Sequence, residues 1–308
     1  MSEINPPVSK VWSSVQIWAE MVKLSHSIFA LPFAFIAAFL AGRHVPGRGW
    51  PFWGQLGLVV MGMVSARSVA MTFNRIVDAQ IDARNPRTAQ RPLPSGRLSF
   101  ATAWLMWGLS ALTFGLACMG FFIFYDNSWP VIFSGPVLAI LCGYSFTKRF
   151  TKCSHVYLGA AISMSPVAAW IAVHPESIGL STWLLMIVVT CWVGGFDIIY
   201  ACQDIEIDRR DHLHSLPSRV GPRISLWIAK GLHLLVVVGL LALGWVEALG
   251  AWYHVGVILA AILLLVENLL VRPGDYRMVN VAFFTINGIV SLVVAFTTIM
   301  DILWSSPS

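Results

Sequence analysis

The sequence predicts an all-α, polytopic membrane protein that forms a single domain over residues 1–308. Hydrophobic residues make up 57% of the chain and charged residues only 11%, whereas about 25% of the residues in soluble domains are charged. The mean hydropathy is +0.74. Apolar runs long enough to cross a bilayer recur along the chain, and they predict about nine transmembrane helices around a central cavity.

The expected spans follow one another with mostly short connections. They cover residues 24–42, 51–73, 98–122, 128–146, 155–173, 182–202, 223–246, 249–271 and 280–300. The connections after the second and sixth spans are longer, at residues 83–97 and 203–222. Long, charged loops beside a site often act as lids, so we expect these two segments to close over a bound substrate.

Lys and Arg residues are distributed unequally between the expected loops. Of the 20 Lys and Arg residues, 16 fall in the N-terminal segment and in the loops after spans two, four, six and eight. Arg43 and Arg48 lie on the other side of the membrane. Because cytoplasmic loops carry an excess of basic residues, we expect the N-terminus and the functional loops to be cytoplasmic. The net charge of +5 therefore needs no nucleic-acid partner.

Arg67 lies within the second span, where a charge that faces lipid costs about 2.5 kcal/mol or more. We therefore expect Arg67 to face a cavity that holds an anion. The same span leads into Asn74, Asp78 and Asp82, which at four-residue spacing share one side of a helix and form a row about 12 Å long. Carboxylates spaced in this way suit a hard cation such as Mg²⁺. The alternative is a solvated helix end among positive-inside loop charges.

Only cations follow this first acidic row. They include Arg87 and Arg91, whose guanidinium groups suit the phosphate oxygens that Mg²⁺ also binds. Span four ends with Tyr144, Lys148 and Arg149, where a phosphate contact and a positive-inside stop would look alike.

The sixth span ends in a second acidic row. Asp204 and Asp208 repeat the four-residue spacing, and Arg210 follows them. The spacing from Asn74 to Asp204 and from Asp78 to Asp208 is the same 130 residues. Two such rows that leave the membrane on one face can converge on a single site. Asp197 lies deeper in the span, where it either serves that site or pairs with Arg67 or Lys230.

Two acidic rows, Mg²⁺, surrounding cations and an apolar cavity together indicate a substrate with a diphosphate head and an apolar tail. A polyprenyl diphosphate has this chemistry. Metal ions and arginines would neutralise the charge that develops on the leaving diphosphate, and a dry cavity would protect an allylic cation from water.

Four ordered segments resemble the UbiA superfamily of intramembrane prenyltransferases: residues 74–82, TAQRPLPSG at 88–96, YSFTKR at 144–149 and YACQDIEID at 200–208. The resemblance covers nearly the whole chain. It looks closest to bacterial 4-hydroxybenzoate polyprenyltransferases and to the similar enzymes of futalosine-type menaquinone synthesis.

In that family the two Asp-rich motifs bind Mg²⁺ and diphosphate. The resemblance therefore implies metal-binding roles for Asn74, Asp78, Asp82, Asp204 and Asp208. It also implies contacts of Arg67, Lys148 and Arg149 with the diphosphate or the acceptor. One position departs from the family pattern, because Arg75 follows Asn74 where the family commonly has Asp. The number of metal ligands in the first motif stays open.

The expected function is the transfer of a polyprenyl group to a ring carbon of a hydroxylated aromatic acid. The enzyme is expected to lie in the bacterial inner membrane, in contact with membrane lipid. 4-Hydroxybenzoate is the expected acceptor, and a dihydroxynaphthoate of menaquinone synthesis is the alternative. A second functional class, an ion-coupled transporter, also places carboxylates in the membrane. For the transferase, the expected catalytic residues are Arg67, Asp78, Asp82, Asp204 and Asp208. The expected substrate contacts are Arg67, Asn74, Arg87, Arg91, Tyr144, Lys148, Arg149 and Arg210.

Overall fold

The computed structural model describes residues 7–22 and 30–305. Within these ranges the secondary structure is helical, apart from one isolated bridge between Arg272 and Asp275. The all-α class predicted from the sequence is therefore confirmed.

Among the described residues, eight helical segments are long and apolar enough to cross a membrane. Their helices are α3 (Trp53–Arg84), α4 (Phe100–Tyr125), α5 (Trp129–Gly143) with the 3-10 turn Tyr144–Arg149, α6 (Ser154–Val173), α7 (Leu180–Ala201), α10 (Pro222–Val246), α11 (Ala251–Leu270), and α12 (Asn287–Ser305) after the π-helical turn Val281–Ile286. The first predicted span corresponds to α2 (Leu31–Arg43), a shorter apolar helix of 13 residues. The start of that span lies outside the described residues, so eight full-length spans and one shorter helix stand where nine spans were expected.

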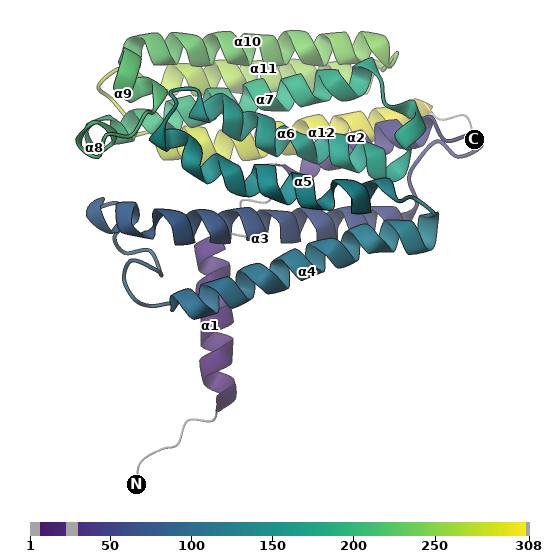
Figure 1. Ribbon diagram of the computed structural model, residues 1–308. Helices are drawn as coiled ribbons and strands as arrows, with labels where there is room; N and C mark the ends of the chain where they lie inside the picture. The colour runs from purple at the N-terminus through teal and green to yellow at the C-terminus, as the bar shows by residue number, and fades with distance from the viewer. Residues whose placement is uncertain (1–6, 23–29, 306–308) are drawn as a thin grey trace.

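The long helices run side by side in one bundle (Figure 1). The short helices α8 (Ile205–Arg210) and α9 (Leu216–Val220) lie at the same end of the bundle as the end of α3. The N-terminal helix α1 (Pro7–Val22) crosses α3 and α4 instead of running along them. Its Trp18 donates a hydrogen bond from Nε1 to Thr72 Oγ1 on α3, at 2.9 Å.

The core lies between α2, α6, α7 and the three C-terminal long helices. Phe33 and Trp192 pack against each other there, with their ring centroids 5.0 Å apart and their planes tilted by 47°. Helices α6 and α7 approach closely at Gly159, where an added Cβ would collide with the backbone carbonyl of Thr190. Small residues permit such close approach of helices in membranes. This packing holds α7 against α6, and the second acidic row follows directly after α7, in the 3-10 turn Cys202–Asp204 and in α8.

Helix α3 continues to Arg84, so the whole first row lies on one helix, as its four-residue spacing predicted, although the expected membrane span ended at residue 73. The second acidic row is followed by a segment that differs from the sequence prediction. The predicted loop 203–222 is largely helical. Ser215 caps α9 by accepting a hydrogen bond from the Ser218 N–H, and Pro217 stands in the first turn. This combination is a helix-start signal that the expectation of a loop overlooked.

Candidate active site

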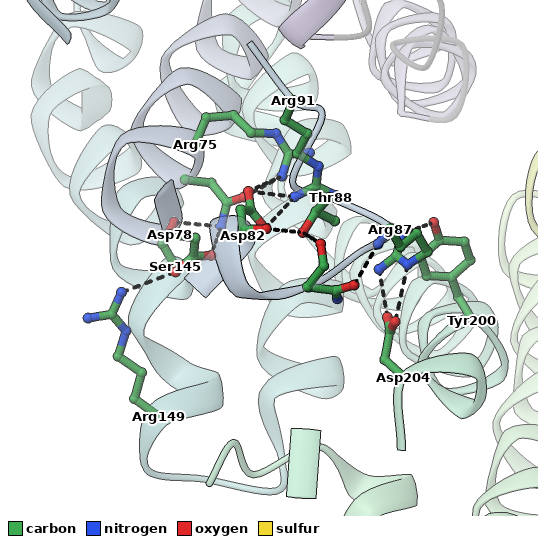
Figure 2. A network of polar contacts seen from close by, with 12 residues as sticks. Arg75, Asp78, Asp82, Arg87, Thr88, Arg91, Ser145, Arg149, Tyr200 and Asp204 are labelled. Carbon is green, nitrogen blue, oxygen red and sulfur yellow. Dashed lines mark hydrogen bonds and ion pairs between the residues drawn. The ribbon is translucent and has the colours of Figure 1, made fainter. Parts of the chain in front are cut away.

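The first acidic row begins with a contact between Asn74 and Asp78 on α3. Asn74 Nδ2 donates to Asp78 Oδ2 at 2.9 Å and lies 3.4 Å from Ser145 Oγ. Arg149 Nη2 donates to the other oxygen of Asp78 at 3.1 Å. Both carboxylate oxygens are therefore engaged, one by an amide and one by a guanidinium (Figure 2).

Asp82, at the end of this row, is buried against two arginines. Arg91 Nη1 lies 2.7 Å from each of its carboxylate oxygens, and Arg75 Nη1 lies 3.8 Å from Oδ2. Arg75 also donates to Asn74 Oδ1 at 3.3 Å. Arg75, the residue that departs from the family pattern, thus adds a positive charge between Asn74 and Asp82.

Arg87 pairs with Asp204, the first carboxylate of the second row. Its Nε and Nη2 atoms donate to the two oxygens of Asp204 at 3.1 and 2.7 Å, and its Nη1 donates to Tyr200 Oη at 3.0 Å. Burial acts to lower the pKa of Arg87, but the facing carboxylate of Asp204 outweighs this effect and the pKa is raised. Arg87 and Arg91 belong to the same segment between α3 and α4, so this one segment joins both acidic rows (Figure 2).

Asp208 has different surroundings from the other three aspartates. It is 4% exposed and accepts a hydrogen bond from the side chain of Ser215, while its Oδ2 is buried without a partner among the described residues. The Lys148 side chain interacts electrostatically with Asp208 and Asp204. A buried carboxylate oxygen without a partner is costly, and a bound ligand would offset that cost.

The donor set fits Mg²⁺, which prefers carboxylate oxygens and the oxygens of a bound phosphate. In the part of the chain that the structure describes, no three His, Cys, Asp or Glu side chains are grouped as metal ligands. Arginine side chains instead neutralise Asp78, Asp82 and Asp204. Asp208 Oδ2 has no partner among the described residues, so a cation could bind it without displacing another side chain.

An apolar cavity of about 540 Å³ lies between α3, α4, α5, α6 and α7, and its lining on α3 reaches Met71, one turn before the first acidic row. Arg67 and Tyr144 belong to its lining, and Tyr144 directly precedes Ser145, the residue near Asn74. Arg67 Nε is buried and has no hydrogen-bond partner among the described residues. The position of Arg67 in the cavity lining agrees with the expectation that its side chain faces a cavity. Its Nε–H is available to donate to an anion.

Arg210 lies apart from the carboxylates of both acidic rows. It donates to the carboxylate of Asp211 at 3.0 and 3.3 Å and to the backbone carbonyl of Arg84 at 3.1 Å. Its contacts therefore connect α8 to the end of α3.

Sequence reasoning missed His155, at the start of α6. Its Nδ1 lies 2.6 Å from Asp197 Oδ2, and its side chain is 1% exposed. The alternative that paired Asp197 with Arg67 or Lys230 is therefore wrong, and Lys230 lies over the Trp227 ring instead. A lone histidine in an apolar run carries no spacing signal, so only the packing of α6 on α7 reveals this pair.

Comparisons with known proteins agree with this geometry. Residues 30–289 match the profile of the UbiA prenyltransferase family. A protein of Yersinia pseudotuberculosis serotype IB named 4-hydroxybenzoate octaprenyltransferase is 34% identical over 218 residues, which cover 70% of this chain and 73% of that protein.

Two solved structures share the fold. The apo structure of a UbiA homolog from Aeropyrum pernix K1 has a TM-score of 0.79 and 29% identity, and the alignment covers 90% of this chain and 98% of that one. A UbiA homolog from Archaeoglobus fulgidus bound to GPP and Mg²⁺ has a TM-score of 0.71 at 16% identity, with 93% and 99% coverage.

Proposed function

Because the chain belongs to the UbiA prenyltransferase family, we propose that it transfers a polyprenyl group from a polyprenyl diphosphate to a ring carbon of 4-hydroxybenzoate, with Mg²⁺ as cofactor. The chain is an integral membrane prenyltransferase. The named relative supports the aromatic acceptor, and the Archaeoglobus homolog bound to GPP and Mg²⁺ supports the diphosphate and the metal. We further propose that the acidic end of the bundle lies at the cytoplasmic face of the bacterial inner membrane, and the excess of Lys and Arg in the loops at that end supports this orientation.

One arrangement carries the proposal: both acidic rows meet the arginines of a single segment beside an apolar cavity. Arg87 and Arg91 lie four residues apart and contact Asp204 and Asp82 respectively. The neighbouring cavity provides the apolar surroundings that a prenyl tail needs. An ion-coupled transporter would need the carboxylates but neither the arginines nor the apolar cavity.

The proposed roles follow from this arrangement. Bound Mg²⁺ would neutralise charge on the diphosphate and so make it a better leaving group. Its ligands would come from Asn74, Asp78, Asp82, Asp204 and Asp208. The contacts to the diphosphate would come from Arg67, Arg87, Arg91, Tyr144, Lys148 and Arg149.

In the reaction, the bond between the allylic carbon and the diphosphate oxygen breaks, and the diphosphate keeps the electron pair. A ring carbon of the acceptor forms the new carbon–carbon bond and then loses its proton, which the released diphosphate accepts. The cavity lining beyond Arg67 and Tyr144 is almost entirely apolar, which keeps water away from the allylic cation. The arginines that reach the diphosphate stabilise the charge that develops on it.

The proposal is tested by incubating the purified protein with radiolabelled polyprenyl diphosphate, Mg²⁺ and 4-hydroxybenzoate. We expect a lipophilic labelled product that contains the aromatic acid. Asp208→Asn, which keeps the shape of the side chain and removes its charge, is the control and should form no product. A dihydroxynaphthoate is tested in parallel. Product with the naphthoate alone would overturn the proposed acceptor, and no product with either acid would overturn the aromatic transferase.

A further inference from the structure

The two contacts of the His155 ring determine which nitrogen carries its proton. Its Nε2 lies 3.2 Å from the backbone nitrogen of Leu216, which can only donate, so Nε2 accepts and is not protonated. The proton therefore lies on Nδ1, which donates to Asp197 Oδ2 at 2.6 Å. His155 is thus a neutral imidazole in one tautomer, held between α7 and the first residue of α9.

The segment that donates to His155 also contacts the second acidic row. Ser215 precedes Leu216, is fully buried, and hydrogen-bonds the carboxylate of Asp208. The backbone of the same segment is held a second time, because the His214 N–H donates to the Lys148 carbonyl at 2.7 Å. The contact with His155 therefore helps to fix where the Ser215 hydroxyl lies, together with the contact of His214, and this hydroxyl orients Asp208.

The orientation of Asp208 matters because of its other oxygen. Ser215 engages one side of the carboxylate, and Oδ2 is buried without a partner among the described residues. Rotation of the carboxylate would exchange the two oxygens and move the one that has no partner. A hydrogen bond to a metal-binding carboxylate prevents such rotation, and the loss of such a contact lowers metal affinity about 10- to 100-fold.

We propose that His155 is a positioning residue for the divalent cation of this enzyme, acting through Leu216 and Ser215 on the carboxylate of Asp208. The inference rests on the proposed function, which assigns a cation to Asp208. His155 touches neither the substrate nor the cation. Its effect requires one donor and one acceptor on opposite sides of the side chain, and a glutamine amide also provides both.

The experiment measures Mn²⁺ binding to the purified full-length protein by electron paramagnetic resonance titration, with Mn²⁺ as the probe. His155→Leu removes both contacts, His155→Gln retains a donor and an acceptor, and Ser215→Ala removes only the hydroxyl on Asp208. His174→Leu is the matched control, because His174 lies at the other end of the same helix. Thermal unfolding is recorded for every variant.

We expect His155→Leu and Ser215→Ala to raise the Mn²⁺ dissociation constant about 10-fold or more. The values for His155→Gln and His174→Leu should stay close to that of the wild type. Unchanged binding in His155→Leu, or equally weak binding in His155→Gln, would overturn the positioning role. Unchanged binding in Ser215→Ala would overturn the route through Asp208, and this variant decides the question if His155→Leu does not fold. Product formation by the wild type is measured separately, so a failure of the proposed function is seen there and not in the Mn²⁺ titration.

Discussion

Replacing Arg87 by methionine should strengthen divalent-cation binding when no diphosphate is present. Arg87 donates to both oxygens of Asp204, at 3.1 and 2.7 Å, so a cation that binds Asp204 must first displace the guanidinium. Arg87→Met keeps much of the length of the side chain and removes its charge. The same variant should bind the prenyl diphosphate more weakly, because a positive charge for the phosphate oxygens is lost.

The size of the effect follows from how exposed the pair is. The Arg87 side chain is 36% exposed and that of Asp204 is 10% exposed. Hydrogen bonds to charged groups contribute about 1.5–3 kcal/mol, and exposed ion pairs contribute at most about 1 kcal/mol. A half-buried pair should lie between these values, at about 1–2 kcal/mol. This corresponds to a decrease of about 5- to 30-fold in the dissociation constant of the cation.

Arg97→Met is the matched control. Arg97 follows Arg87 in the same segment, but it pairs with Glu20 of α1 at 2.9 Å, away from both acidic rows. The Mn²⁺ affinities of the two variants and of the wild type are compared by titration under the same conditions. An unchanged Mn²⁺ affinity in Arg87→Met, or the same gain in Arg97→Met, would refute the view that Arg87 competes with the cation.

Three further predictions concern catalysis and packing. Asp78→Ala and Asp208→Ala should each lower turnover by more than about 100-fold, since each removes a proposed carboxylate ligand of the metal. Wild-type turnover should vanish in EDTA and return with Mg²⁺. Full activity without divalent metal would contradict this mechanism. Arg67→Met should lower kcat/KM about 10- to 150-fold, which is the equivalent of one charged hydrogen bond, with little change in thermal stability. If the variant has the kinetics of the wild type, Arg67 does not contact the substrate. Gly159→Ala should lower the thermal stability by about 1–3 kcal/mol, because its Cβ would collide with the backbone of α7. Gly108→Ala, where a Cβ meets open space, is its control, and equal stability of the two variants in thermal unfolding would contradict the packing argument.

The sequence predicted features that depend on helical spacing. Asn74, Asp78 and Asp82 recur every four residues, and the structure holds all three on α3, with the first two in hydrogen-bond contact. The apolar runs likewise predicted where the long helices lie, because a bilayer-spanning helix needs a minimum apolar length. The ends of the helices were harder to predict. Helix α3 extends beyond its apolar run because helical hydrogen bonds continue into polar residues.

Contacts between distant segments could not be predicted in the same way. His155 and Asp197 are 42 residues apart, and nothing in their spacing relates them. Their contact arises because a glycine lets α6 approach α7 closely. The role of Ser215 was hidden for a related reason, since α9 had been expected to be part of a loop. In both cases the missing information was the position of a backbone in space and not the type of a residue.

The arginines beside the acidic rows show how one residue can have two partners at different times. Their charge predicted contacts with phosphate, yet in the structure Arg87, Arg91 and Arg149 bind the carboxylates that are the proposed metal ligands. The two assignments are compatible if each guanidinium leaves its carboxylate when a cation replaces it and then turns to the diphosphate that arrives with the cation. Under this exchange, the segment between α3 and α4 is attached to both rows before substrate binds. Closure over the substrate would therefore begin with the release of Arg87 and Arg91, and the strength of those two ion pairs would limit how readily the metal–diphosphate complex enters.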